Sequence, residues 1–111
     1  MAKVRYSPAS VQDMEEIGGY IADSLKSPMA ALNTLNKMQD AIDRLEDFPL
    51  MGSPLSSPDG MITEYRFLVC GNYLVFYRAT EDNVFIDRVI YGRRDYMAIL
   101  FGNLSEDNAK P

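Results

Sequence analysis

The chain has 111 residues, of which 47% are hydrophobic and 24% are charged, and this balance is typical of a single globular domain. One cysteine excludes an internal disulfide and fits a reducing cytoplasm. No histidine is present, so the commonest metal ligand and general base are absent. No stretch contains the roughly 18 consecutive apolar residues that a membrane-spanning helix needs. We therefore expect a cytoplasmic protein with no metal, no cofactor and no membrane partner. The net charge of −5 argues against broad, non-specific binding to nucleic acids.

The first half of the chain predicts a short strand at Lys3–Tyr6 and two helices after it. Each helix begins at a Ser-Pro pair, Ser7-Pro8 or Ser27-Pro28, in which Ser caps the first turn and Pro fits the first helical position. Apolar residues then recur every three or four positions, which predicts an antiparallel helical hairpin that covers one face of a sheet. We expect Gly18-Gly19 to allow a close approach of the two helices, or a bend.

The second half of the chain predicts a three-stranded meander. Runs rich in Val, Ile, Phe and Tyr span residues 62–69, 73–79 and 84–91, with tight turns between them. Residues 49–61 contain three Pro, three Ser and two Gly and are expected to form a loop. A short C-terminal helix is expected at residues 95–101, before a polar tail at 102–111. The order β-α-α-β-β-β, with this last helix, predicts an α+β fold in one domain, residues 1–101.

Five arginines fall within residues 62–96, although the chain as a whole is acidic. They are Arg66, Arg78, Arg88, Arg93 and Arg94, and Tyr65, Tyr73, Tyr77, Tyr91 and Tyr96 accompany them. One interpretation is a patch on the open face of the sheet, where Arg matches phosphate oxygens and Tyr stacks on bases. The other interpretation is that the arginines pair with Glu64, Asp87 and Asp95 on a solvated face.

RNA cleavage through the ribose 2′-OH needs a general base, a cation for the charged phosphorane and an acid for the leaving oxygen. Without histidine, the candidates for proton transfer are Glu64 and a tyrosine such as Tyr96, with Arg66 and Arg94 as the cations. The candidate residues for binding a substrate or target are Arg78, Arg88, Arg93, Tyr73 and Tyr77.

The segment Gly71–Tyr96, GNYLVFYRATEDNVFIDRVIYGRRDY, resembles the signature of the RelE/ParE superfamily of bacterial toxins. Residues Tyr6–Leu25 resemble that family's passage from its first strand into its first helix, and the resemblance covers residues 3–101. It implies a small cytosolic toxin encoded beside an antitoxin that neutralises it, as in plasmid-stabilisation modules. RelE-like members cut messenger RNA on the ribosome without metal and so inhibit translation. ParE-like members inhibit DNA gyrase and are not known as nucleases.

The resemblance places Arg66 near a catalytic basic residue of the RelE-like nucleases, and Arg94 at the arginine that follows their last strand. Two positions depart from the nuclease pattern. Tyr73 stands where another catalytic arginine is expected, and Leu100 stands where RelE has its C-terminal tyrosine. Tyr96, one helical turn away, would then have to act in its place.

Three functions follow from the resemblance. The preferred hypothesis is a ribosome-dependent endoribonuclease. The second is a gyrase inhibitor, because Gly-Arg-Arg-Asp at residues 92–95 is close to the ParE-like ending and a net charge of −5 opposes docking on ribosomal RNA. The third is a degenerate toxin that binds only its antitoxin. All three predict an antitoxin segment laid along the helical hairpin and over the open face of the sheet.

Overall fold

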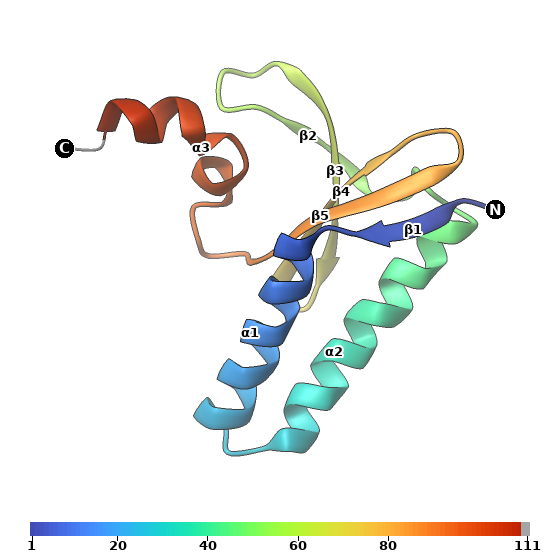
Figure 1. The fold of residues 1–111 in the computed structure, drawn as a ribbon, viewed down its shortest axis with the longest axis vertical. Coiled ribbons are helices and arrows are strands. Elements are labelled where there is room, and N and C mark those ends of the chain that lie inside the picture. The colour runs from blue at the N-terminus through green and yellow to red at the C-terminus, as the bar shows by residue number, and fades with distance from the viewer. Residues whose placement is uncertain (110–111) are drawn as a thin grey trace.

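The structure is a computed structural model that describes residues 1–109, with side chains as far as Gly102 (Figure 1). Its elements are β1 (Lys3–Tyr6), α1 (Pro8–Ser24), α2 (Pro28–Asp43), the 3₁₀ turn η1 (Arg44–Glu46), β2 (Ser53–Ser56), β3 (Ile62–Cys70), β4 (Tyr73–Ala79), β5 (Asn83–Tyr91) and α3 (Tyr96–Ala109). The predicted α+β fold is confirmed, since the N-terminal strand, the two helices, the meander and the C-terminal helix occur in the predicted order.

The five strands form one sheet in the order β1-β5-β4-β3-β2. β1 runs parallel to β5, and all other neighbours are antiparallel. The prediction of a loop over residues 49–61 was wrong in part, because Ser53–Ser56 pair with β3 as an edge strand. The content of Pro, Ser and Gly in residues 49–61 predicted a loop and gave no indication of this strand. Pro54 cannot donate a backbone hydrogen bond, but an edge strand tolerates it because one of its sides has no partner.

Helix α3 is longer than predicted. It continues past Phe101 to Ala109, so the predicted polar tail is helical over residues 102–109, while residues 110–111 lie outside the described part of the chain. The sequence after Phe101 contains Gly and few apolar residues, so it lacks the apolar stripe from which a helix is predicted.

The predicted Ser-Pro signals begin both long helices. The Oγ of Ser7 accepts a hydrogen bond from the backbone N–H of Ser10 at 2.9 Å, and Pro8 is the first residue of α1. In the same way the Oγ of Ser27 accepts from the N–H of Ala30 at 3.1 Å. Each serine therefore satisfies one of the N–H groups that a helix start leaves without a partner.

Two apolar cores lie on the two faces of the sheet. Successive residues of a strand point to opposite faces, and β4 accordingly supplies Tyr77 to one core and Phe76 to the other. The first core lies against the helical hairpin and also contains Met38, Ile42, Leu45, Val75, Val84, Ile86 and Val89. The second core contains Leu55, Phe76 and Ile90, with Tyr96, Met97, Ile99, Leu100 and Phe101 of α3 packed against it. The face that was expected to be open is therefore covered in part by α3.

Helices α1 and α2 lie side by side, as Figure 1 shows, and glycine sets their spacing. A Cβ atom built on Gly18 would lie 3.0 Å from Cδ1 of Leu35 in α2. A Cβ atom on Gly19 would meet nothing within 4 Å. The close approach predicted for this pair of glycines is confirmed, and Gly18 alone provides it.

We expect Gly19→Ala to raise the free energy of unfolding by about 0.5–1 kcal/mol, because alanine lowers the entropy of the unfolded chain and favours the helix. Gly18→Ala is the matched control. It makes the same gain in helix propensity but presses on Leu35, so its net gain should be smaller. Urea unfolding measures both, and equal stabilisation by the two substitutions would contradict the close packing at Gly18.

Candidate functional site

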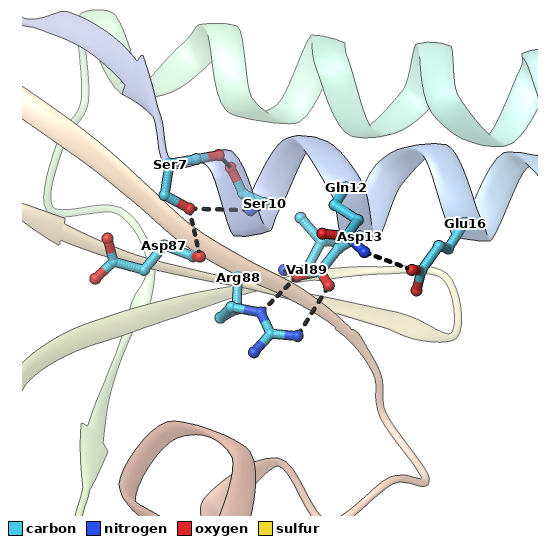
Figure 2. A network of polar contacts seen from close by, with 8 residues as sticks. All are labelled: Ser7, Ser10, Gln12, Asp13, Glu16, Asp87, Arg88 and Val89. Atoms are coloured by element: carbon cyan, nitrogen blue, oxygen red, sulfur yellow. Dashed lines mark hydrogen bonds and ion pairs between the residues drawn. The ribbon is translucent and has the colours of Figure 1, made fainter.

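Helix α1 closes an open edge of strand β5. β1 ends at Tyr6 while β5 continues, so the backbone of residues 87–89 would lack partners on that side. The Oγ of Ser7 donates to the carbonyl oxygen of Asp87 at 2.7 Å, and the N–H of Val89 donates to Oδ2 of Asp13 at 2.9 Å (Figure 2). Side chains at the start of α1 thus replace the missing strand.

The same Asp13 carboxylate holds Arg88. Nε of Arg88 donates to Oδ2 at 2.7 Å and Nη2 donates to Oδ1 at 2.9 Å, which is the bidentate geometry that arginine and carboxylate prefer (Figure 2). Asp13 is 9% exposed, and its hydrogen bonds raise the pKa of the Arg88 guanidinium above the usual value. A buried carboxylate needs such partners, because an unpaired charge in the interior is costly. Arg88 is therefore part of the joint between α1 and β5.

Arg78 is paired on the second face of the sheet. Its Nε donates to Oδ2 of Asp87 at 2.7 Å, its Nη1 lies 3.6 Å from Oε1 of Glu64, and its guanidinium lies 5.4 Å from the ring centroid of Phe85. A bulge in the β4–β5 pairing leaves Asp87 without a cross-strand partner and turns it towards Arg78. Burial and the charge of Asp87 raise the pKa of the neighbouring Tyr65. The contacts at Arg78 match the interpretation in which arginines pair with Glu64 and Asp87.

Arg66 and Tyr77 fasten the segment that leads into β2. Nη1 of Arg66 donates to the carbonyl oxygen of Gly52 at 2.8 Å. The Tyr77 hydroxyl accepts from the N–H of Gly52 at 2.9 Å and donates to the carbonyl oxygen of Pro49 at 2.8 Å. Burial raises the pKa of Tyr77. Only glycine fits at position 52, since a Cβ there would lie 2.6 Å from the Tyr77 hydroxyl oxygen and 2.8 Å from the carbonyl oxygen of Phe67.

The remaining candidates lie near the end of β5. Arg93 and Arg94 are exposed, and their guanidinium groups make no hydrogen bond or ion pair with any described residue. Tyr96 packs on Phe76, with ring centroids 5.3 Å apart. Asp95 caps α3 through the N–H of Ala98 at 3.1 Å, so it pairs with no arginine among the described side chains.

The structure divides the candidate residues between the two faces of the sheet. The cross-strand partner of Arg66 is Tyr77, in the core beneath the helical hairpin, whereas the partner of Arg78 is Tyr65, which lies beneath α3. Tyr96 packs on the α3 side as well. Arg66 and Tyr96 are therefore on opposite faces.

Two residues with structural roles, Asp13 and Gly52, were not predicted from the sequence. Neither an acidic residue on a helix nor a glycine in a loop indicates a partner that is distant in the sequence.

The described residues were also compared with the requirements of a metal site and of a membrane-spanning helix. No three His, Cys, Asp or Glu side chains in the described part of the chain are arranged to hold a metal ion. No helix within residues 1–109 is long and apolar enough to cross a membrane.

We expect Tyr77→Phe to lower the free energy of unfolding by about 1–2 kcal/mol, because it leaves the N–H of Gly52 and the carbonyl of Pro49 without a partner. Tyr91→Phe is the control, since the Tyr91 hydroxyl makes no hydrogen bond with a described residue and the residue is 38% exposed. Chemical denaturation of both variants provides the measurement. An unchanged midpoint for Tyr77→Phe would show that the segment before β2 is held in some other way.

Comparison with known proteins finds one family model and several solved structures that are similar to this chain. The family model described as "ParE toxin of type II toxin-antitoxin system, parDE" matches residues 4–96. The chain is similar to a structure from the chromosomal ParDE toxin–antitoxin system of P. aeruginosa, with a TM-score of 0.67 and 16% identity over 82% of this chain and 96% of that chain. It is similar to YafQ from E. coli strain BL21(DE3), with a TM-score of 0.56 and 19% identity over 92% and 100% of the two chains. It is also similar to the E. coli DinJ–YafQ complex, with a TM-score of 0.55 and 17% identity over 82% and 93%. No curated protein matches the sequence.

Proposed function

This chain belongs to the family of ParE toxins of type II toxin–antitoxin systems, and we propose that it acts by binding a protein target, DNA gyrase, and not by cleaving RNA. The family model extends over residues 4–96, which include both long helices and the strands up to the end of β5. The preferred hypothesis from the sequence was the RelE-like nuclease, so this proposal favours the second of the three functions.

The observation that supports the proposal is the separation of Arg66 from Tyr96 by the sheet. Cleavage through the 2′-OH needs a base, an acid and a cation around one phosphate. Arg66 faces the carbonyl groups of the 49–52 segment, and Glu64 lies beside Arg78. The four candidate catalytic residues therefore do not surround a common point.

The distribution of charge also supports binding to a protein. Arg78 and Arg88 are neutralised by Asp87 and Asp13, so their charges contribute little attraction for phosphate. With a net charge of −5, the chain lacks the broad positive surface that holds a protein on ribosomal RNA.

Arg93 and Arg94 are the arginines of the 62–96 segment that remain exposed and without a partner in the described residues. They lie on the connection between β5 and α3, where the chain turns away from the sheet. Exposed arginine is enriched among the residues that dominate protein interfaces. We therefore assign the gyrase contact to Arg93, Arg94 and the first turn of α3.

The partner that restrains this activity is a cognate antitoxin in the cytoplasm. The P. aeruginosa relative is part of a ParDE toxin–antitoxin system, and YafQ is paired with DinJ in its complex. By analogy, a polypeptide encoded beside this chain binds and neutralises it.

The proposal is tested with the purified chain in two assays, gyrase supercoiling of plasmid DNA and mapping of messenger RNA 5′ ends on translating ribosomes. We expect inhibition of supercoiling with intact transcripts. Arg93→Ala/Arg94→Ala should raise the concentration for half-maximal inhibition at least about tenfold. Lys3→Ala/Arg5→Ala removes the same charge from β1, beside the start of β5 and away from its end, and should have little effect.

New 5′ ends within translated codons, lost in Arg66→Ala and Arg94→Ala, would overturn the proposal and establish the nuclease. Activity in neither assay, with no arrest of growth on expression, would instead indicate the degenerate toxin.

A further inference from the structure

The turn that joins β2 to β3 lies beside α3 (Figure 1), and a hollow of about 590 Å³ lies between them. Met61 lines the hollow from the turn, and Met97 and Phe101 line it from the helix. The ring of Tyr65 in β3 supports Phe101, with ring centroids 5.8 Å apart. Pockets of roughly 300–1,000 Å³ hold ligands of drug size, so this hollow has room for a long side chain.

Hydrogen bonds fix the wall that the turn provides. The N–H of Ser57 donates to the carbonyl oxygen of Met61 at 2.8 Å, and the N–H of Gly60 donates to the carbonyl oxygen of Ser57 at 2.8 Å. The Ser57 hydroxyl also donates to Oδ1 of Asp59. A surface that is ordered before binding loses little conformational entropy when a partner docks. The hollow is therefore suited to a defined contact.

The apolar part of the hollow is accessible to a partner, since Met61 is 64% exposed. Methionine is unbranched and flexible, so it adapts to side chains of different shapes. Lysine and arginine bury their methylene stems along apolar surface of this kind while the charged head stays in a polar setting. The hollow can therefore take a long cationic side chain as well as an apolar one.

Two carboxylates select the cationic side chain. Asp59 and Asp95 line the hollow, and neither forms an ion pair with a described residue. The hydrogen bond from Ser57, followed by one from the backbone of Met61, lowers the pKa of Asp59, so this carboxylate is charged at neutral pH. Among the described residues, no lysine or arginine lines the hollow. An incoming cation would pair with these charges, whereas an acidic side chain would be repelled.

The hollow is continuous with the surface to which we assign the gyrase contact. Asp95 follows Arg94 directly, and Met97 and Ala98 lie in the first turn of α3. The connection is held in place, because the N–H of Arg94 donates to the carbonyl oxygen of Tyr91 at 2.9 Å. A partner that binds Arg94 and the first turn of α3 therefore also meets the hollow.

We propose that the hollow receives a lysine or arginine side chain of DNA gyrase. The stem of that side chain packs against Met61 and Met97, and its cation lies beside the carboxylates of Asp59 and Asp95. Gyrase offers such side chains, because a protein that binds DNA neutralises phosphates with lysine and arginine. This inference rests on the proposed function and deepens it, since it names the kind of gyrase side chain that the toxin recognises.

Removal of the two charges is the first test. Asp59→Asn/Asp95→Asn keeps oxygens that can accept from the Ser57 hydroxyl and from the N–H of Ala98, so the turn and the helix start are retained. Affinity for purified gyrase is measured by surface plasmon resonance at two salt concentrations, and inhibition is measured by plasmid supercoiling. We expect binding and inhibition to weaken at least about tenfold, with a smaller dependence on salt.

The control for this test is Glu15→Gln/Asp23→Asn. It removes the same charge from α1, which packs on the other face of the sheet, and it should bind gyrase like the unaltered chain.

A cation supplied by the chain itself is the second test. Met61→Lys places an ammonium group beside Asp59 and Asp95, where it competes with the gyrase side chain, so we expect a similar loss of binding and inhibition. Met29→Lys is the matched control, because Met29 is 66% exposed, close to the 64% of Met61, but lies on α2. Circular dichroism verifies that each variant is folded.

The outcomes separate this inference from the proposed function. If the unaltered chain inhibits gyrase, and Asp59→Asn/Asp95→Asn and Met61→Lys inhibit equally well, the assignment of the hollow is overturned and gyrase remains the target. If these variants lose binding to the polypeptide encoded by the adjacent reading frame but keep their affinity for gyrase, the hollow serves the antitoxin and the inference fails. If the unaltered chain does not bind gyrase, the proposed function and the inference are both overturned.

Discussion

The Asp13 carboxylate is the constraint on which the rest of the structure depends. It accepts one hydrogen bond from the backbone of Val89 and two from the side chain of Arg88, and in doing so it joins the first helix to the last strand. β1 is too short to cover the whole of β5, and without this joint the backbone N–H of Val89 would lose its partner on that side. The joint also directs α1 across the sheet and thereby positions the helical hairpin over its first core.

This joint changes the interpretation of the basic residues. Arg88 stabilises the fold, Arg78 is held between Asp87 and Glu64, and Arg66 holds the backbone that enters β2. Because these arginines already donate hydrogen bonds within the protein, they have few free N–H groups for a phosphate. The surfaces that remain are the Arg93–Arg94 connection and the hollow between the β2–β3 turn and α3. Both have the character of protein interfaces, which agrees with a toxin that acts by binding.

The sequence predicted elements well wherever a local rule decides them. The meander, both Ser-Pro helix starts and the close approach at Gly18 follow from periodicity, capping and the lack of a side chain. β2 was missed because an edge strand can carry proline. The partners of the arginines could not be predicted from the sequence, because they depend on strand register and on the bulge that displaces Asp87. A shift of one residue along a strand moves a side chain to the other face, so neighbouring arginines can serve unrelated purposes.

The most direct test of this account is a double-mutant cycle between Asp13 and Arg88, made with Asp13→Asn, Arg88→Met and the pair together. Asparagine keeps an oxygen that can accept from Val89, so the cycle isolates the contribution of the ion pair. The account predicts a coupling free energy of about 1.5–3 kcal/mol in equilibrium unfolding. A coupling near zero would contradict it, because Arg88 would then be free to bind an external phosphate.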